Sequence, residues 1–163
     1  MKILFRGTVV FLAALAFAVS AEAQAPSLEG SMAAKKIVRD NNDREVAMPA
    51  DRVEPKDVIE YTIEYRNTGS IPADGVKFVG PVPPGTVYVA ETARQNEMLE
   101  PYFSIDGGKT YQKAPVTYVV NKGTPQEEVK VAEPEMITHI RWEMDGALEV
   151  AGTVQTAYRV RIK

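Results

Sequence analysis

Cysteine is absent from this 163-residue sequence. An exported chain without cysteine must be held together by burial of apolar side chains and by backbone pairing, because no disulfide can form. The absence also excludes a lipid-modified cysteine and a Cys–His catalytic pair, and any zinc site would need mostly carboxylate ligands. Histidine is nearly absent too: His139 is the only one, so a histidine-based triad has a single candidate base.

Acid–base chemistry by two carboxylates needs neither residue type, and the sequence holds 22 Asp and Glu residues that could converge in space. That alternative stays open at this stage. Most of these residues, however, alternate with apolar ones or lie in polar segments, which is typical of a solvated surface. We therefore expect a protein that is not an enzyme, and we assign no catalytic, cofactor-binding or metal-binding residue and no cofactor.

Long hydrophobic runs are missing apart from one, between Val9 and Val19. Lys2 and Arg6 precede this run, and Ala21-Glu22-Ala23 follows it as a small-x-small cleavage site. The pattern predicts a secretory signal peptide over residues 1–23 and a periplasmic or extracellular location. A retained membrane anchor is disfavoured because roughly 18 or more apolar residues are needed to span a bilayer.

Clustered basic residues are scarce. Without Lys2, Arg6 and Glu22, the 19 basic and 22 acidic side chains become 17 and 21, a net charge of −4. Lys35-Lys36 is then the only adjacent basic pair. Contacts with nucleic acid or anionic lipid need grouped Lys and Arg, so we expect neither partner, and no membrane insertion once the signal peptide is removed.

The clearest local pattern lies in the stretch Val58–Val76. Ile59, Tyr61, Ile63 and Tyr65 alternate with charged or polar residues, which is the two-residue period of a strand with one buried face. Asn67-Thr68-Gly69-Ser70 then predicts a turn. The core should therefore be built from paired strands.

Further apolar runs predict the other strands, and the residues between them predict turns. The expected strands cover Met32–Val38, Glu45–Met48, Val76–Val79, Thr86–Ala90, short segments around Tyr102-Phe103-Ser104 and Tyr111, Val116–Val120, Thr138–Met144 and Thr153–Lys163. In Thr138–Met144, the alternation places Trp142 in the core and His139 on the exposed face.

Two turns have special compositions. Asp40-Asn41-Asn42-Asp43 offers oxygen ligands for calcium, but its spacing differs from a dedicated calcium loop, so a solvated turn is the preferred interpretation. Pro81-Val82-Pro83-Pro84-Gly85 cannot lie in the middle of a sheet. We expect the chain to leave one sheet, or to cross to another, at this corner.

Ser104-Ile105-Asp106-Gly107-Gly108-Lys109-Thr110-Tyr111 resembles the Asp-box, a hairpin found in sialidases and other proteins. The resemblance implies that the aspartate braces the turn and that the hairpin has a structural role, away from any catalytic centre. A single copy is weak support for glycan chemistry.

These patterns together predict an all-β fold: an antiparallel β-sandwich, immunoglobulin-like in outline, with seven to nine strands. The expected organisation is a signal peptide over 1–23, a flexible leader over 24–31 and one sandwich domain over 32–163. A membrane barrel is disfavoured by short, irregularly spaced strands and by the lack of two aromatic belts.

Three segments taken in order resemble a bacterial conserved-repeat family, catalogued as domain of unknown function eleven. They are YTIEYRNTGSIPADGVKFVGPVPPGTVYV, SIDGGKTY and THIRWEMDGALEVAGTVQTAYRVRIK. The resemblance implies a secreted or surface-located sandwich of the kind that is repeated in tandem in long envelope proteins, and it carries over no catalytic residue. This sequence holds one copy, with no sorting signal or second hydrophobic segment, which argues against a stalk or spacer role.

Two functions follow as hypotheses. The first is a non-catalytic structural or protein-interaction module of the cell envelope, which docks on another envelope or surface protein through an exposed strand edge. The second is a module that binds carbohydrate or another small molecule through the loops Glu91–Pro101 and Asn121–Glu135. Those loops lack aromatic residues apart from the bordering Tyr102, which favours the first. A stiffening Lys–Asn cross-link would involve Lys56, Lys77 and Asn67, each of which also has an ordinary surface or turn role.

Overall fold

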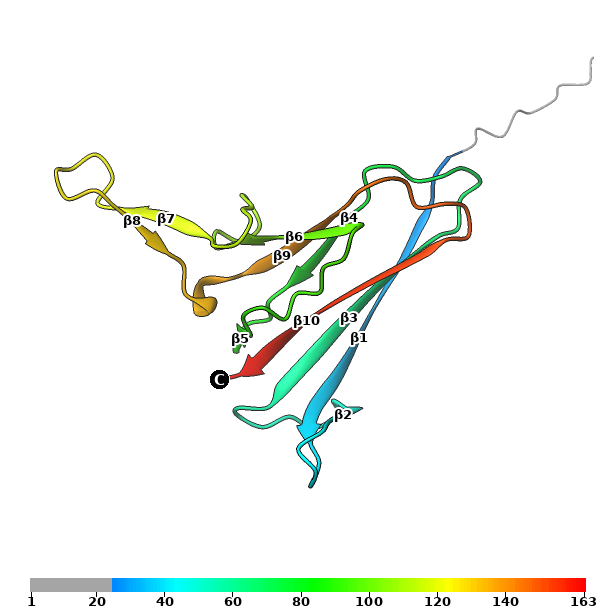
Figure 1. Ribbon diagram of the computed structural model, residues 1–163, viewed down its shortest axis with the longest axis horizontal. Coiled ribbons are helices and arrows are strands. Elements are labelled where there is room, and N and C mark those ends of the chain that lie inside the picture. Colours follow the sequence, from blue (N-terminus) through cyan, green and yellow to red (C-terminus); the bar gives the residue numbers. More distant parts are fainter. Residues whose placement is uncertain (1–24) are drawn as a thin grey trace, which may run out of the picture.

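Antiparallel strands make up nearly all of the regular structure in a computed structural model of the protein, which describes residues 25–163 (Figure 1). The predicted signal peptide, residues 1–23, lies outside the described residues. The only helical element in the described part is one turn of 3₁₀-helix, η1. The elements, in chain order, are β1 (Leu28–Arg39), β2 (Glu45–Pro49), β3 (Val58–Asn67), β4 (Lys77–Pro81), β5 (Thr86–Tyr88), β6 (Leu99–Ser104), β7 (Thr117–Val120), β8 (Glu128–Val131), η1 (Pro134–Met136), β9 (His139–Met144) and β10 (Thr153–Ile162).

The strands form three antiparallel sheets. The large sheet has the order β2-β1-β3-β10-β5, the small sheet has the order β4-β9-β6, and β7 pairs only with β8. In Figure 1 the large and small sheets lie close together near the start of β1 and diverge toward β7 and β8, which project as an arm. The prediction of an all-β, antiparallel fold is confirmed, and the arrangement is consistent with a β-sandwich. The described residues form ten strands, where seven to nine were expected. The immunoglobulin-like outline stays a prediction.

The core lies between the large and small sheets, on the faces that the alternation indicated. Ile59 and Ile63 of β3 are buried, and so are Ile140 and Trp142 of β9. Tyr158 of β10 is fully buried, and its ring lies 5.9 Å from that of Trp142. Burial also raises the pKa of the Tyr158 hydroxyl, which keeps it protonated and able to donate to the carbonyl of Pro81.

The proline-rich corner carries the chain from the small sheet to the large one, as expected. Pro81 ends β4, and Thr86 begins β5 on the edge of the other sheet. Between them the Thr86 N–H donates to the Pro83 carbonyl over 3.1 Å, and Gly85 has a φ of 81°. Glycine supplies that left-handed conformation without steric strain, so the corner can reverse tightly.

Several boundaries differ from the sequence predictions. β6 begins at Leu99, inside the expected loop Glu91–Pro101, and the short strand expected around Tyr111 is only an isolated bridge between Phe103 and Gln112. The flexible leader was expected over residues 24–31, but β1 already begins at Leu28 and pairs with β3 from that residue onward. The segment Asn121–Glu135 was expected to be a loop, but it contains β8 and the start of η1. The start of β1 was missed because its partner β3 is distant in sequence, whereas β8 is a charged strand that pairs with the neighbouring β7, and its composition does not distinguish it from a loop.

Candidate docking surface

The first half of β1 has a partner on one side only. β1 pairs with β3 from Leu28 to Ile37, but with β2 only from Lys35 to Arg39. Within residues 25–163, the segment 28–34 therefore has a free edge of seven residues, which we call the β1 edge.

The hydrogen-bond alternation shows which groups this edge presents. Thr68 N–H donates to the Ser27 carbonyl over 2.8 Å, which starts the ladder between β1 and β3. Because paired and unpaired positions alternate along an antiparallel ladder, the odd-numbered residues of β1 bond to β3. The N–H and C=O groups on the β1 edge consequently belong to Leu28, Gly30, Met32 and Ala34.

The inner-face side chains of the β1 edge include exposed apolar residues and no charged residue. Met32 lies opposite the buried Ile63 and so points to the inner face of the large sheet, yet 47% of its surface is exposed. Leu28, on the same face, is 40% exposed. The first charged residue on that face is Lys36, whose Nζ lies 2.6 Å from the Asp57 carboxylate. Long, apolar edges without proline or inward-pointing charge are templates for pairing with another strand.

The edge of β6, by contrast, is closed by its own neighbours. Asn96 and Leu99 exchange both backbone hydrogen bonds, at 3.2 and 3.3 Å. Phe103 and Gln112 do the same, at 2.7 and 2.9 Å. Between these pairs lies Pro101, which has no N–H to offer. A further strand could not pair along β6 without displacing these contacts.

The remaining outer edges of the large sheet and the small sheet are short and carry protective residues. β2 and β4 span five residues each and end in Pro49 and Pro81, and β4 begins with the exposed Lys77. β5 spans three residues, and the N–H of Thr86 is already bonded to Pro83. Short strands, lysine and proline are the devices that prevent edge-to-edge pairing. Among the edges of these two sheets in residues 25–163, the β1 edge is the one that lacks them.

The Asp40–Asp43 segment is a turn between β1 and β2, as the preferred interpretation had it. The Asp40 carboxylate accepts the Asn42 and Arg44 N–H groups over 2.8 and 3.0 Å, and it also binds the Arg44 side chain. Asp43 bonds to Arg39 over 2.9 Å. In residues 25–163 no group of three or more His, Asp or Glu side chains is placed to hold a metal ion.

The Asp-box hairpin also has the expected construction. Asp106 accepts from the Thr110 hydroxyl over 2.6 Å and from the backbone N–H groups of Lys109 and Thr110. Ser104, which is 1% exposed, donates to Asp106 over 2.7 Å. All these contacts lie within the turn, so they describe a brace rather than a binding site.

The residues considered for a Lys–Asn cross-link, and the single histidine considered as a catalytic base, make ordinary structural contacts or are exposed. Asn67 is fully buried and its amide donates to the carbonyls of Ile71 and Leu148, over 2.8 and 2.9 Å. Lys56 is exposed, and Lys77 lies 3.6 Å from Glu143. His139 is half-buried rather than exposed, and the hydrogen-bond partner of its Nδ1 is the Thr138 hydroxyl at 3.2 Å.

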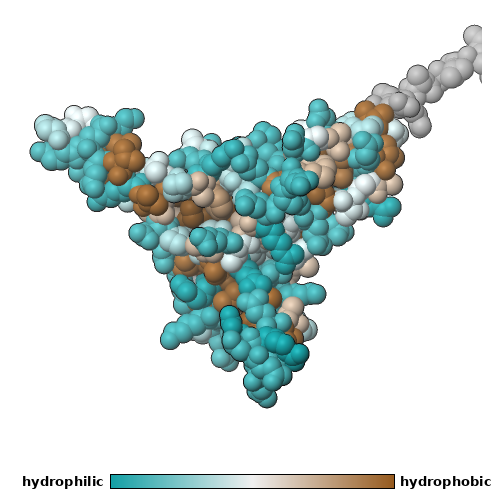
Figure 2. Space-filling view, in the orientation of Figure 1, coloured by the Kyte–Doolittle hydropathy of each residue, from teal (hydrophilic) through white to brown (hydrophobic). Residues whose placement is uncertain are grey.

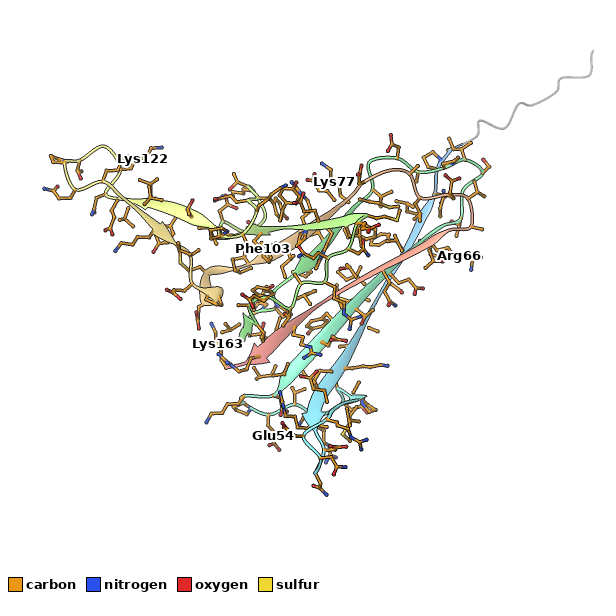
Figure 3. The ribbon with its side chains drawn as sticks, viewed as in Figure 1. Glu54, Arg66, Lys77, Phe103, Lys122 and Lys163 are labelled. Atoms are coloured by element: carbon orange, nitrogen blue, oxygen red, sulfur yellow. The ribbon has the colours of Figure 1, made fainter. Side chains whose placement is uncertain are left out.

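Both loops proposed for ligand binding reach the same apolar hollow, of about 460 Å³. Glu91–Pro101 supplies Ala93 and Pro101 to its lining, and Asn121–Glu135 supplies Val131 and Pro134. The flanking strands add the aromatic side chains that the loops lack. These are Tyr88 of β5 and Phe103 of β6, whose rings lie 5.5 Å apart. Figure 3 labels Phe103, which lies close to the point where the arm leaves the small sheet.

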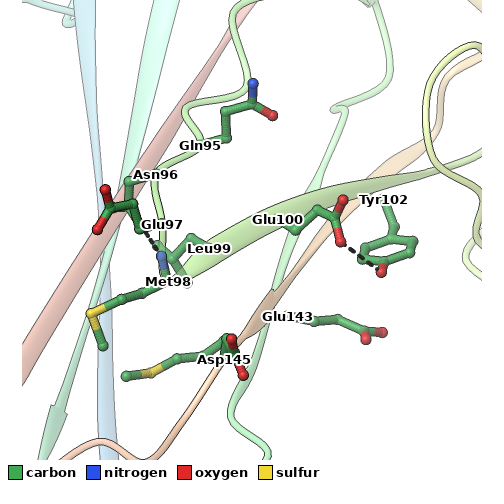
Figure 4. A pocket seen from close by; sticks show the side chains of 10 residues that line it. Gln95, Asn96, Glu97, Met98, Leu99, Glu100, Tyr102, Glu143 and Asp145 are labelled. Atoms are coloured by element: carbon green, nitrogen blue, oxygen red, sulfur yellow. Dashed lines mark hydrogen bonds between the residues drawn. The ribbon is translucent and has the colours of Figure 1, made fainter.

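A second hollow, of about 500 Å³, is polar and lies beside β6 and β9 (Figure 4). Four carboxylates line it, but Glu100 is bonded to the Tyr102 hydroxyl over 3.0 Å and to Lys113 over 2.6 Å. Glu143 lies 2.6 Å from Arg141. The Lys113 ammonium holds the pKa of Glu100 below its usual value. A general acid needs the opposite shift, so this arrangement favours a charged surface over acid–base chemistry.

No helix in the described part of the chain has the length and apolar character needed to cross a bilayer. No known family model matches the chain, and no curated protein matches it in sequence. The resemblance to the conserved-repeat family therefore stays a prediction, and the structure of the β1 edge carries the functional interpretation.

Proposed function

We propose that this protein is an exported, non-catalytic structural or protein-interaction module of the bacterial cell envelope, which docks on a partner protein through the β1 edge. The observation that supports the proposal is the free, seven-residue edge from Leu28 to Ala34. Added strands gain affinity from main-chain hydrogen bonds and specificity from alternate side chains. The β1 edge offers both, with backbone groups in the plane of the sheet and Leu28 and Met32 on one face.

Site-directed photo-cross-linking in intact envelopes tests this proposal. A photoreactive residue at Met32 reports on the β1 edge, and the same residue at Met98 is a matched control, because the two side chains are 47% and 48% exposed. We expect one adduct of defined mass at Met32 and none at Met98. The adduct peptide should map to an extended segment of the partner. Adducts at Met98 alone, or none at either position, would contradict docking through β1.

A second candidate function is the binding of a small apolar molecule in the 460 Å³ hollow, since both predicted loops line it. Its lining is mostly apolar, which suits an apolar ligand better than a carbohydrate. Titration with a fluorescent naphthalene sulfonate tests it. Ala93→Leu should fill part of the hollow and weaken binding, whereas Ala47→Leu on the exposed strand β2 should not. Equal binding of the probe by both variants would show that it binds outside this hollow.

A further inference from the structure

We infer that the partner of the β1 edge is a second copy of this chain, with two β1 strands paired antiparallel about a twofold axis at Ser31. This inference rests on the proposed function, because it names the partner of the same edge. The register places Leu28 opposite Ala34 of the second copy and Gly30 opposite Met32 of the second copy. The two large sheets then join into one continuous sheet across the axis.

The length of the free edge selects this register. All seven residues from Leu28 to Ala34 are paired in it, and the strand β2 limits any longer overlap, because Pro49 already lies opposite Lys35. The residues with outward N–H and C=O groups, which are the even-numbered ones, fall opposite one another. Each hydrogen-bonding position on one copy therefore meets a hydrogen-bonding position on the other.

The side chains of the inner face are complementary in size in the same register. A Cβ on Gly30 would come within 2.7 Å of the Tyr65 ring, so that ring lies over Gly30 and fills the space that a side chain there would take. Met32 of the second copy lies directly opposite Gly30 and beside that ring. Methionine sulfur packs favourably against aromatic rings. The two half-exposed methionines would thus be covered, together with Leu28.

The charges of the outer face are complementary as well. Glu29 and Lys35 are exposed on β1, and within residues 25–163 neither takes part in an ion pair. In the proposed register Glu29 lies diagonally next to Lys35 of the second copy, and symmetry repeats the pair. Diagonal neighbours across a strand pair are within reach of long side chains. A parallel pairing would place like residues together and lose this complementarity.

Sedimentation of the exported protein tests the self-association. We expect a concentration-dependent dimer. Met32→Pro removes one outward N–H from each copy without breaking the pairing to β3, and should weaken the dimer by about tenfold or more. Ala47→Pro is the matched control, because the N–H of Ala47 points outward from β2 and lies outside the proposed interface. Thermal unfolding of both variants shows whether the fold is kept.

A cysteine pair tests the register independently of proline. The natural chain has no cysteine, so a single substitution gives an unambiguous readout. Ser31→Cys should form a disulfide-linked dimer under mild oxidation, since facing Cα atoms at a non-hydrogen-bonded pair lie about 4.5 Å apart. In Ala33→Cys the two cysteines are offset by four residues, or about 13 Å, along the strands. Its cross-linking should be slower by about tenfold or more.

The outcomes separate this inference from the proposed function. A protein that stays monomeric at all concentrations, with no preference for Ser31→Cys over Ala33→Cys, would overturn the second copy as partner. If Met32 still cross-linked to a different envelope protein, docking through β1 would survive that result. If Met32 gave no adduct of any kind, both would fail. A dimer that Met32→Pro leaves intact would overturn the β1 interface.

Discussion

Asn67 joins three segments of the chain through one buried carboxamide. Its amide donates to the carbonyls of Ile71 and Leu148, and its oxygen accepts the Gly69 N–H over 2.9 Å. Leu148 follows 81 residues later in the sequence. The residue that the sequence marked as a turn former is therefore also a link between the end of β3 and the approach to β10.

Replacing this amide should destabilise the whole fold. Asn67→Ala leaves the Ile71 carbonyl and the Gly69 N–H without these partners, whereas the Leu148 carbonyl keeps its bond from the Ala73 N–H. We expect a loss of about 3 kcal/mol in the free energy of unfolding. Urea denaturation measures it. Asn42→Ala, in the exposed turn after β1, is the control and should change stability by less than about 0.5 kcal/mol. Equal effects of the two substitutions would refute the bracing role of Asn67.

Asp106 should make the stability of the hairpin depend on pH. The hydrogen bond from the Thr110 hydroxyl, with further donors, holds the Asp106 pKa well below its ordinary value of 3.8. Its stabilising contribution is therefore fully present above about pH 4 and is lost as the pH falls toward the folded-state pKa. We expect Asp106→Asn to lower the urea midpoint more at pH 7 than at pH 3. An equal loss at both pH values would contradict this assignment.

At the scale of elements, the close approach of β4 to the large sheet depends on Gly80. A Cβ at this position would come within 2.6 Å of the Tyr158 ring and 3.1 Å of Ile63. β4 can therefore lie against β3 and β10 only with glycine at this point. The Tyr158 hydroxyl, which donates to the Pro81 carbonyl, adds a polar link at the same contact.

Gly80→Ala should push the two sheets apart locally. We expect a loss of about 1–3 kcal/mol, typical of overpacking in a buried contact, measured by urea denaturation. The neighbouring Val79 is 42% exposed, so Val79→Ala should change stability by less than about 1 kcal/mol. A Gly80→Ala protein as stable as the natural one would show that the contact adapts without strain.

Individual strands were predictable to different degrees. β3, β9 and β10 follow from alternation, because one of their faces is more buried than the other; Ala157 of β10 departs from this, since it is buried on the outer face. The beginning of β1 was missed because Leu28–Ser31 is short, contains small residues and is exposed on both faces. Its strand conformation comes from pairing with β3, which no local pattern reports.

At the scale of the whole molecule, β7 and β8 form an arm with little support from the sandwich. Within the part of the chain that the structure describes, they pair only with each other, and Val129 and Val131 are 65% and 60% exposed. Figure 2 shows hydrophobic residues on this arm, and Lys122 marks its tip in Figure 3. Isolated two-stranded hairpins are marginally stable in water.

Hydrogen exchange should distinguish the arm from the sandwich. We expect the amides of β7 and β8 to exchange at least about tenfold faster than those of β3, β9 and β10, because the arm opens without unfolding the core. Native-state exchange followed by mass spectrometry measures this. Uniform protection across all these strands would indicate that the arm is covered, for example by a partner.

The surfaces proposed for function depended on the tertiary structure. The loops Glu91–Pro101 and Asn121–Glu135 were recognisable, but their convergence on one hollow with Tyr88 and Phe103 was not. Docking through a strand edge was also a sequence hypothesis without a location. The β1 edge is free because β2 is too short to cover the first half of β1. Alternation in the sequence shows that a segment is a strand, but it does not show which strands lie side by side or how far they overlap.

The sequence by itself determined the class of fold, the buried faces of the central strands, the proline corner and the two polar turns. Each of these is encoded in neighbouring residues, either by the two-residue period of a half-buried strand or by residues that restrict backbone angles. The tertiary structure decided strand order, the unpaired length of β1 and the contacts of Asn67 and Gly80. These depend on which distant segments share hydrogen bonds and van der Waals contact, so they became visible only once the sheets were assembled.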